Sequence, residues 1–158
     1  MKKIVIILAL IIGVLSLQEE QIIIPKDTIR FRIIANSNKE EDQKLKKEIV
    51  SQLQKELLRK ENNIEEARIN IKNSIPKFEE QVKKVTNNYT ISYGQNYFPQ
   101  KEWKNVTFPE GEYESLVITL GEGTGDNFWC ILFPPLCMID ETEEEYPSLI
   151  KEVLKRYI

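Results

Sequence analysis

The sequence predicts an α+β fold: a single domain with a mostly antiparallel sheet, packed on one face by two or three helices and preceded by an N-terminal signal segment. The chain has 158 residues, enough for one compact domain and too few for two of ordinary size. Strand-like and helix-like stretches follow one another in the order strand, two helices, several strands, helix. This mixture of element types is typical of α+β domains.

The first 17 residues predict export. Two lysines precede an unbroken apolar or small-residue stretch from Ile4 to Leu17, which is the pattern of a secretory signal. As a helix this stretch would cover about 21 Å of the roughly 30 Å of bilayer hydrocarbon, so a cleaved signal is favoured and an uncleaved anchor is the alternative. Residues 18–27, broken by Pro25, are expected to form a linker, and residues 28–158 the folded domain.

The folded part is expected to begin with a half-buried strand over residues 28–35. Polar Arg30 and Arg32 alternate there with apolar neighbours, which places both arginines on one face of a sheet. Two guanidinium groups on one face need either solvent or carboxylate partners. Residues 36–38 then supply capping residues, and Ser37 or Asn38 could each form a capping box with the glutamate three positions later.

Two helical patterns follow the strand. Apolar residues of the first fall on one side, at Leu45, Ile49, Val50, Leu53, Leu57 and Leu58. Those of the second recur at steps of three and four, at Ile64, Ala67, Ile71, Ile75, Phe78, Val82 and Val85. Because an interior proline costs about 3 kcal/mol, the second helix is expected to kink or restart at Pro76, with Ser74 as its cap.

The second half of the chain predicts more strands and a last helix. Residues 89–93, 113–120 and 128–132 are rich in β-branched and aromatic residues. Pro147 stands at a plausible helix start, and apolar residues recur at helical spacing from there to Tyr157.

Composition excludes several classes of function. The chain has no histidine, which removes the commonest general base and the commonest zinc ligand. Its net charge is −3 and its basic residues are dispersed, which argues against nucleic-acid binding. The glycines at 121, 123 and 125 are followed by a strand-like run rather than a helix, so they do not form a nucleotide-binding loop. No cofactor, metal or small-molecule substrate is expected.

Cys130 and Cys137 are the two cysteines of the chain. Two thiols without histidine fall short of a structural zinc site, and in an exported domain such a pair is expected to form a disulfide. Closing this short loop would stabilise the fold by about 2.5 kcal/mol. Two buried free thiols are the alternative.

At three places the sequence resembles the stage II sporulation protein R family. The first resembles I-R-x-R-x-I-A-N-S followed by D-Q-x-x-K, with Ile29, Arg30, Arg32, Ile34, Ala35, Asn36, Ser37, Asp42, Gln43 and Lys46. The second resembles F-P-x-G-x-Y-x-x-L, with Phe108, Pro109, Gly111, Tyr113 and Leu116. The third resembles G-x-G-x-G-x-N-W-W-C-x-x-F-P-P-L-C, with Gly121, Gly123, Gly125, Asn127, Trp129, Cys130, Phe133, Pro134, Pro135, Leu136 and Cys137. Phe128 replaces the first tryptophan, which keeps a ring but loses an indole donor.

The resemblance implies a signalling protein and not an enzyme. Such proteins are secreted from the forespore into the space between the forespore and mother-cell membranes. There they activate a membrane-embedded aspartic protease that processes the precursor of mother-cell sigma factor E. Membrane contact is expected only through the signal segment or that receptor. The candidate partner-binding residues are Arg30, Arg32, Asn36, Ser37, Asn127, Phe128, Trp129, Phe133, Pro134 and Pro135, each of which also has a structural explanation as core or cap.

Two other functions remain open from the residues alone. A cell-wall hydrolase would need two of the available carboxylates, at Glu110, Glu112, Glu114, Glu122, Asp126 and Asp140. A wall-binding module or structural spore-envelope protein would need an aromatic platform, for which the candidates are Tyr93, Tyr97, Phe98 and Trp103.

Overall fold

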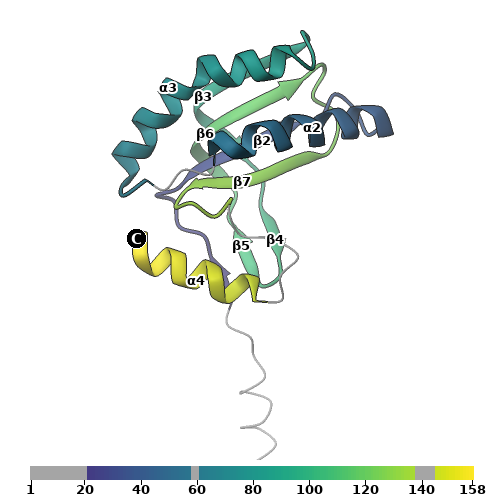
Figure 1. Ribbon diagram of the computed structural model, residues 1–158. Helices are drawn as coiled ribbons and strands as arrows, with labels where there is room; N and C mark the ends of the chain where they lie inside the picture. The colour runs from purple at the N-terminus through teal and green to yellow at the C-terminus, as the bar shows by residue number, and fades with distance from the viewer. Residues whose placement is uncertain (1–20, 58–60, 138–144) are drawn as a thin grey trace, which may run out of the picture.

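The structure, a computed structural model, describes residues 21–57, 61–137 and 145–158 (Figure 1). The signal segment expected at 1–17 and the candidate carboxylate Asp140 lie outside the described residues. Within the described part, no helix has the length and apolar character needed to span a bilayer.

The main sheet has four strands in the order β3-β6-β2-β7. Their bounds are Ile29–Ile34 for β2, Tyr89–Phe98 for β3, Gly111–Leu120 for β6 and Asn127–Phe133 for β7. The β3–β6 and β2–β7 pairs are antiparallel, and the central β2–β6 pair is parallel. The expected α+β fold is confirmed.

Helices α2 (Glu40–Leu57) and α3 (Ile64–Lys83) lie together over one face of this sheet (Figure 1). The odd-numbered residues of β2 point toward them, because side chains alternate along a strand. The main core therefore joins Ile29, Phe31 and Ile33 to the apolar stripes of both helices. The two helical patterns of the sequence account for this layer of the fold.

Helix α3 runs without interruption through Pro76, so the expected restart at Ser74 is wrong. The helix begins instead after Asn63, whose side chain accepts a hydrogen bond from the Glu66 backbone N–H. Pro76 is exposed and removes a single intrahelical bond. The buried Ile71 and Phe78 on either side of it anchor both halves of the helix to the same core.

A second, smaller layer packs beside the main sheet. It consists of the sheet β1-β5-β4, with β1 at Ile22–Ile23, β4 at Lys101–Trp103 and β5 at Val106–Phe108, and of helix α4 at Tyr146–Tyr157. Its core contains Ile22, Ile24, Val106, Ile131, Leu136, Tyr146 and Ile150. Part of the 18–27 segment, expected as a linker, is thus built into the fold through β1.

Candidate functional site

Arg30 and Arg32 project from the face of the main sheet that α2 and α3 do not cover, as their alternation predicts. Their neighbours on this face are aromatic. The strand register places Trp129 of β7 beside Arg32, and Tyr113 of β6 and Phe98 of β3 lie on the same face.

Cations and rings alternate along this face. The Arg30 guanidinium lies 3.3 Å from the Tyr113 ring centroid and 5.4 Å from that of Phe98. The Arg32 guanidinium lies 4.7 Å from the Phe98 centroid and 5.9 Å from that of Trp129, and Lys101 Nζ lies 5.6 Å from the Trp129 centroid. We call this series the cation–aromatic ladder, made of Tyr113, Arg30, Phe98, Arg32, Trp129 and Lys101.

The inner end of the ladder is buried and incompletely hydrogen-bonded. Arg30 is 1% exposed, and its Nη1 donates to the Pro109 carbonyl at 3.4 Å. Its Nε and Nη2, and Nε of Arg32, are buried without a hydrogen-bond partner among the described residues. Burial lowers the pKa of Arg30 to about 10 and also lowers that of Arg32. The expected solvent or carboxylate partner of Arg30 is thus replaced by ring faces, on which a guanidinium can stack.

The outer end of the ladder reaches the surface. Arg32, Trp129 and Lys101 are each partly exposed, whereas Phe98 and Tyr113 belong to a small core cluster with Val117. Asn127, two residues before Trp129 on β7, is also partly exposed, and its buried Oδ1 has no hydrogen-bond partner in the described part of the chain. Residues that could touch a partner therefore lie at this end.

Asn36 and Ser37 lie in a different place, the turn after β2. The glycine-rich loop before β7 is bonded to this turn, and we call residues 35–38 with 121–126 the glycine latch. The bonds are Gly125 N to Ala35 O at 2.9 Å, Thr124 N and Oγ1 to Asn36 O at 3.1 and 2.8 Å, Glu122 N to Asn36 Oδ1 at 2.9 Å and Asp126 N to Asn38 Oδ1 at 2.7 Å.

Two positions of the latch require glycine because the two chain segments lie too close together to leave room for a side chain. A Cβ at Gly125 would lie 2.3 Å from the Ser37 carbonyl oxygen. One at Gly121, where φ is +54°, would lie 2.2 Å from Asn36 Oδ1. The glycines at these two positions therefore serve close packing of the chain.

The latch also holds the first turn of α2. Asn36 Nδ2 and Ser37 Oγ donate to Asp42 Oδ2 at 2.9 and 2.5 Å, and Lys46 Nζ donates to the Asp126 carbonyl at 2.7 Å. The hydrogen bonds from Ser37 and Asn36 lower the pKa of Asp42. Ser37 Oγ bonds to Asp42 and accepts from the Lys39 N–H, and Asn38 Oδ1 accepts from the Asp126 N–H, so neither forms the expected capping box. This bonding gives Asn36 and Ser37 a structural role.

The segment from Asn127 to Cys137 is a strand followed by a tight turn. The expected disulfide joins Cys130 to Cys137, with Cα atoms 5.3 Å apart. Phe133 is 3% exposed in the main core, and Pro134 and Pro135 are buried as well. Of the candidates in this segment, Asn127, Phe128 and Trp129 therefore offer more surface to a partner than the buried residues do.

The carboxylates proposed for hydrolysis have ordinary surroundings for a folded domain. Glu114 is bound by the Arg68 guanidinium and accepts a hydrogen bond from the Tyr93 hydroxyl at 2.6 Å. The other described candidates, Glu110, Glu112, Glu122 and Asp126, are exposed. Among the residues that the structure places, no three His, Cys, Asp or Glu side chains gather where they could hold a metal ion.

The aromatic platform proposed for wall binding is also divided. Phe98 is buried and Tyr93 is partly buried against the main core, whereas Tyr97 and Trp103 are 54% and 44% exposed. Sugar binding of the kind suggested would need these rings to share one surface.

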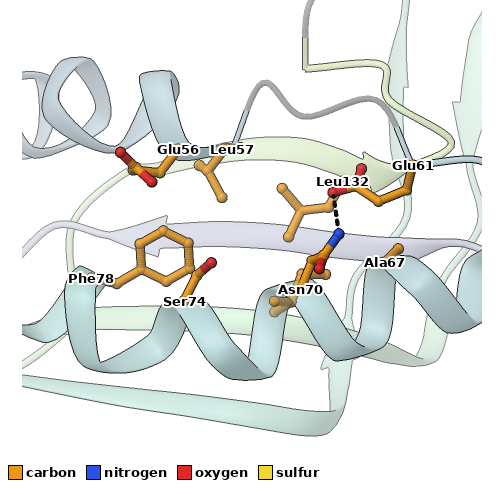
Figure 2. A pocket seen from close by; sticks show the side chains of 9 residues that line it. Glu56, Leu57, Glu61, Ala67, Asn70, Ser74, Phe78 and Leu132 are labelled. Carbon is orange, nitrogen blue, oxygen red and sulfur yellow. Dashed lines mark hydrogen bonds between the residues drawn. The ribbon is translucent and has the colours of Figure 1, made fainter.

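A small pocket lies between α2 and α3 (Figure 2). Its apolar walls include Leu57, Phe78 and Leu132, and Asn70 Nδ2 donates to Glu61 Oε1 at 3.4 Å across one side. Its volume of about 20 Å³ is close to the space that one water needs, too little for an organic substrate.

The fold and the site define a small α+β domain with a partly exposed cation–aromatic face. The family model described as stage II sporulation protein R matches residues 25–143, and the chain belongs to this family. It is 39% identical over 137 residues to stage II sporulation protein R of Bacillus subtilis (strain 168). That alignment covers 81% of this chain and 61% of the relative. No solved structure gives a significant match. Membership of this family supports a role in sporulation.

Proposed function

We propose that this chain is an exported signalling protein of endospore formation. It leaves the forespore, enters the space between the forespore and mother-cell membranes, and activates a membrane-embedded aspartic protease that processes the precursor of mother-cell sigma factor E. The observation that carries this proposal is membership of the stage II sporulation protein R family. The activity acts through surface recognition and uses no cofactor.

The arrangement of the family's characteristic residues supports recognition as the mode of action. The residues of the first and third stretches that resemble the family form most of the glycine latch and supply Arg30, Arg32 and Trp129 of the ladder. The latch fixes the end of β2 against the start of β7, and the disulfide joins the middle of β7 to the turn that follows it. The outer ladder residues are therefore held on rigid strands, which limits the conformational entropy lost when a partner binds.

Activation requires only that the domain bind the active state of the protease better than its inactive state. Inverting a population from 1:99 to 99:1 takes about 5.5 kcal/mol of differential affinity. A few charge-assisted hydrogen bonds and one buried aromatic contact reach this magnitude.

The test is co-expression of the chain, the candidate protease and its precursor substrate in a non-sporulating host. Processed sigma factor, measured by immunoblot, is expected only when all three are present. A host with protease and precursor alone is the control. Processing at the same level without this chain would contradict the proposal, as would no processing when all three are present and folded.

A further inference from the structure

We propose that the outer end of the cation–aromatic ladder, formed by Arg32, Trp129 and Lys101, binds a carboxylate side chain on a polypeptide segment of the partner. The identity of that partner rests on the proposed function. The binding chemistry rests on the ladder itself.

The first argument is unbalanced charge. Arg30, Arg32 and Lys101 follow one another along the ladder, and none of them has a carboxylate partner among the described residues. Arg68, by contrast, binds the Glu114 carboxylate, and the buried Lys46 ammonium donates two short hydrogen bonds, to the Gln43 side-chain oxygen and the Asp126 carbonyl. The ladder differs in placing three cations in succession without a carboxylate among the described residues.

The second argument is unmet hydrogen-bonding capacity. A buried cation without an anion is unfavourable, and ring faces offset only part of that penalty. Arg30 is out of reach of a ligand, so it contributes positive potential rather than contact. Arg32 is within reach, and its planar fork suits the two oxygens of a carboxylate.

The third argument concerns the kind of anion. Asn127, on the same sheet face as Arg32, is partly exposed, and its Oδ1, buried without a partner among the described residues, meets a peptide N–H once the side chain turns outward. A polypeptide offers both a carboxylate and N–H donors, whereas a phosphate polymer offers acceptors alone. The chain is acidic overall, and exposed Glu102 and Asp126 adjoin Lys101 and Asn127 in sequence. These charges would repel a polyanion or an anionic lipid surface more than a single carboxylate flanked by neutral residues.

A binding experiment tests this chemistry without the protease. The full chain in nonionic detergent, carrying Trp103→Phe so that Trp129 is its single tryptophan, is titrated with a short capped peptide that has one glutamate between leucines. We expect a saturable change in Trp129 fluorescence below about 10 mM peptide. The same peptide with glutamine should bind at least about tenfold more weakly, since a hydrogen-bonded charge is lost.

Variants locate the site. Arg32→Gln and Lys101→Gln should each weaken binding of the glutamate peptide about tenfold or more, whereas Arg156→Gln, a matched loss of charge at an exposed position of α4, should not. Lys101 contacts the ladder only at its outer end, so Lys101→Gln remains informative if Arg32→Gln fails to fold. Equal binding of both peptides, or no saturable binding, would overturn the inference. So would binding of polyphosphate or anionic vesicles through these residues in place of the peptide.

The co-expression assay separates the two proposals. If the wild-type chain activates processing and the Arg32 and Lys101 variants do so as well as the Arg156 variant, the site is wrong and the function stands. If the glutamate peptide binds as expected but the wild-type chain does not activate processing, the function is wrong and the site stands.

Discussion

Gly125→Ala should loosen the glycine latch and destabilise the whole domain. The added methyl would lie 2.3 Å from the Ser37 carbonyl oxygen, 2.5 Å from its carbon and 3.0 Å from the Ala35 Cβ. The first two are backbone atoms, which a rotamer change cannot move. The loop must therefore withdraw by roughly 1 Å, because such contacts are well inside the ordinary carbon–oxygen separation.

Withdrawal breaks the two hydrogen bonds at and directly after the substituted position, Gly125 N to the Ala35 carbonyl and Asp126 N to Asn38 Oδ1. At about 1 kcal/mol for each bond, with some loss of packing, we expect the free energy of unfolding to fall by about 2–3 kcal/mol. For a domain of this size that corresponds to a decrease in Tm of roughly 5–10 °C.

Urea unfolding followed by circular dichroism measures this change. Ser92→Ala, at an exposed position of β3, is the control and should change the free energy of unfolding by less than about 0.5 kcal/mol. A loss below about 1 kcal/mol for Gly125→Ala would refute the close-approach argument, because it would mean that the loop accommodates a side chain without losing its bonds.

Three further predictions follow from other parts of the chain. Deleting residues 1–17 should leave a folded domain but abolish signalling in the sporulating cell, and normal precursor processing by that strictly cytoplasmic version would contradict export. Replacing Cys130 and Cys137 by serine should lower the free energy of unfolding by about 2–3 kcal/mol at most. Intact mass with and without reductant, after alkylation of the exported protein, checks the bond, and two freely alkylated thiols would disprove it. The Asp42 pKa is lowered in the folded state, so its contribution to stability is present above the unfolded pKa of about 3.9 and is lost as the pH falls through the folded value. In a plot of the free energy of unfolding against pH, Asp42→Asn should reduce the loss of stability on the acid side. An unchanged acid-side loss would assign the acid sensitivity to other carboxylates.

Local periodicity predicts much of this fold. Each helix and the strands β2, β3, β6 and β7 overlap patterns that the sequence displays, because burial of one face imposes a period of two or about 3.6 residues. Pairing between distant strands leaves no such local signature. The parallel contact of β2 with β6, and the hairpin β4–β5 within the turn-rich stretch before Gly111, appear only in three dimensions.

The candidate site shows the same division. Alternation places Arg30 and Arg32 on one face, but their partners Phe98 and Tyr113 come from strands more than sixty residues away, through a register that alternation does not specify. Residue type also does not predict which aromatic side chains are buried. Phe133 is in the core and Trp129 reaches the surface, although both belong to β7 and both are aromatic.

The ladder implies a test in which stability and activity should respond differently. Replacing Arg30 by methionine removes a buried cation with two unpartnered nitrogen atoms and keeps an unbranched apolar chain against Tyr113 and Phe98. Because a buried charge often contributes no net stability compared with an apolar side chain of similar volume, we expect the free energy of unfolding to stay within about 1 kcal/mol of wild type or to rise. Activation of processing should nevertheless fall, since positive potential at Arg32 is lost. Urea unfolding and the co-expression assay measure the two effects on the same variant. A loss of more than about 2 kcal/mol would show that the rings already satisfy the Arg30 cation within the domain. The ladder would then be a closed structural unit with no need of an external carboxylate.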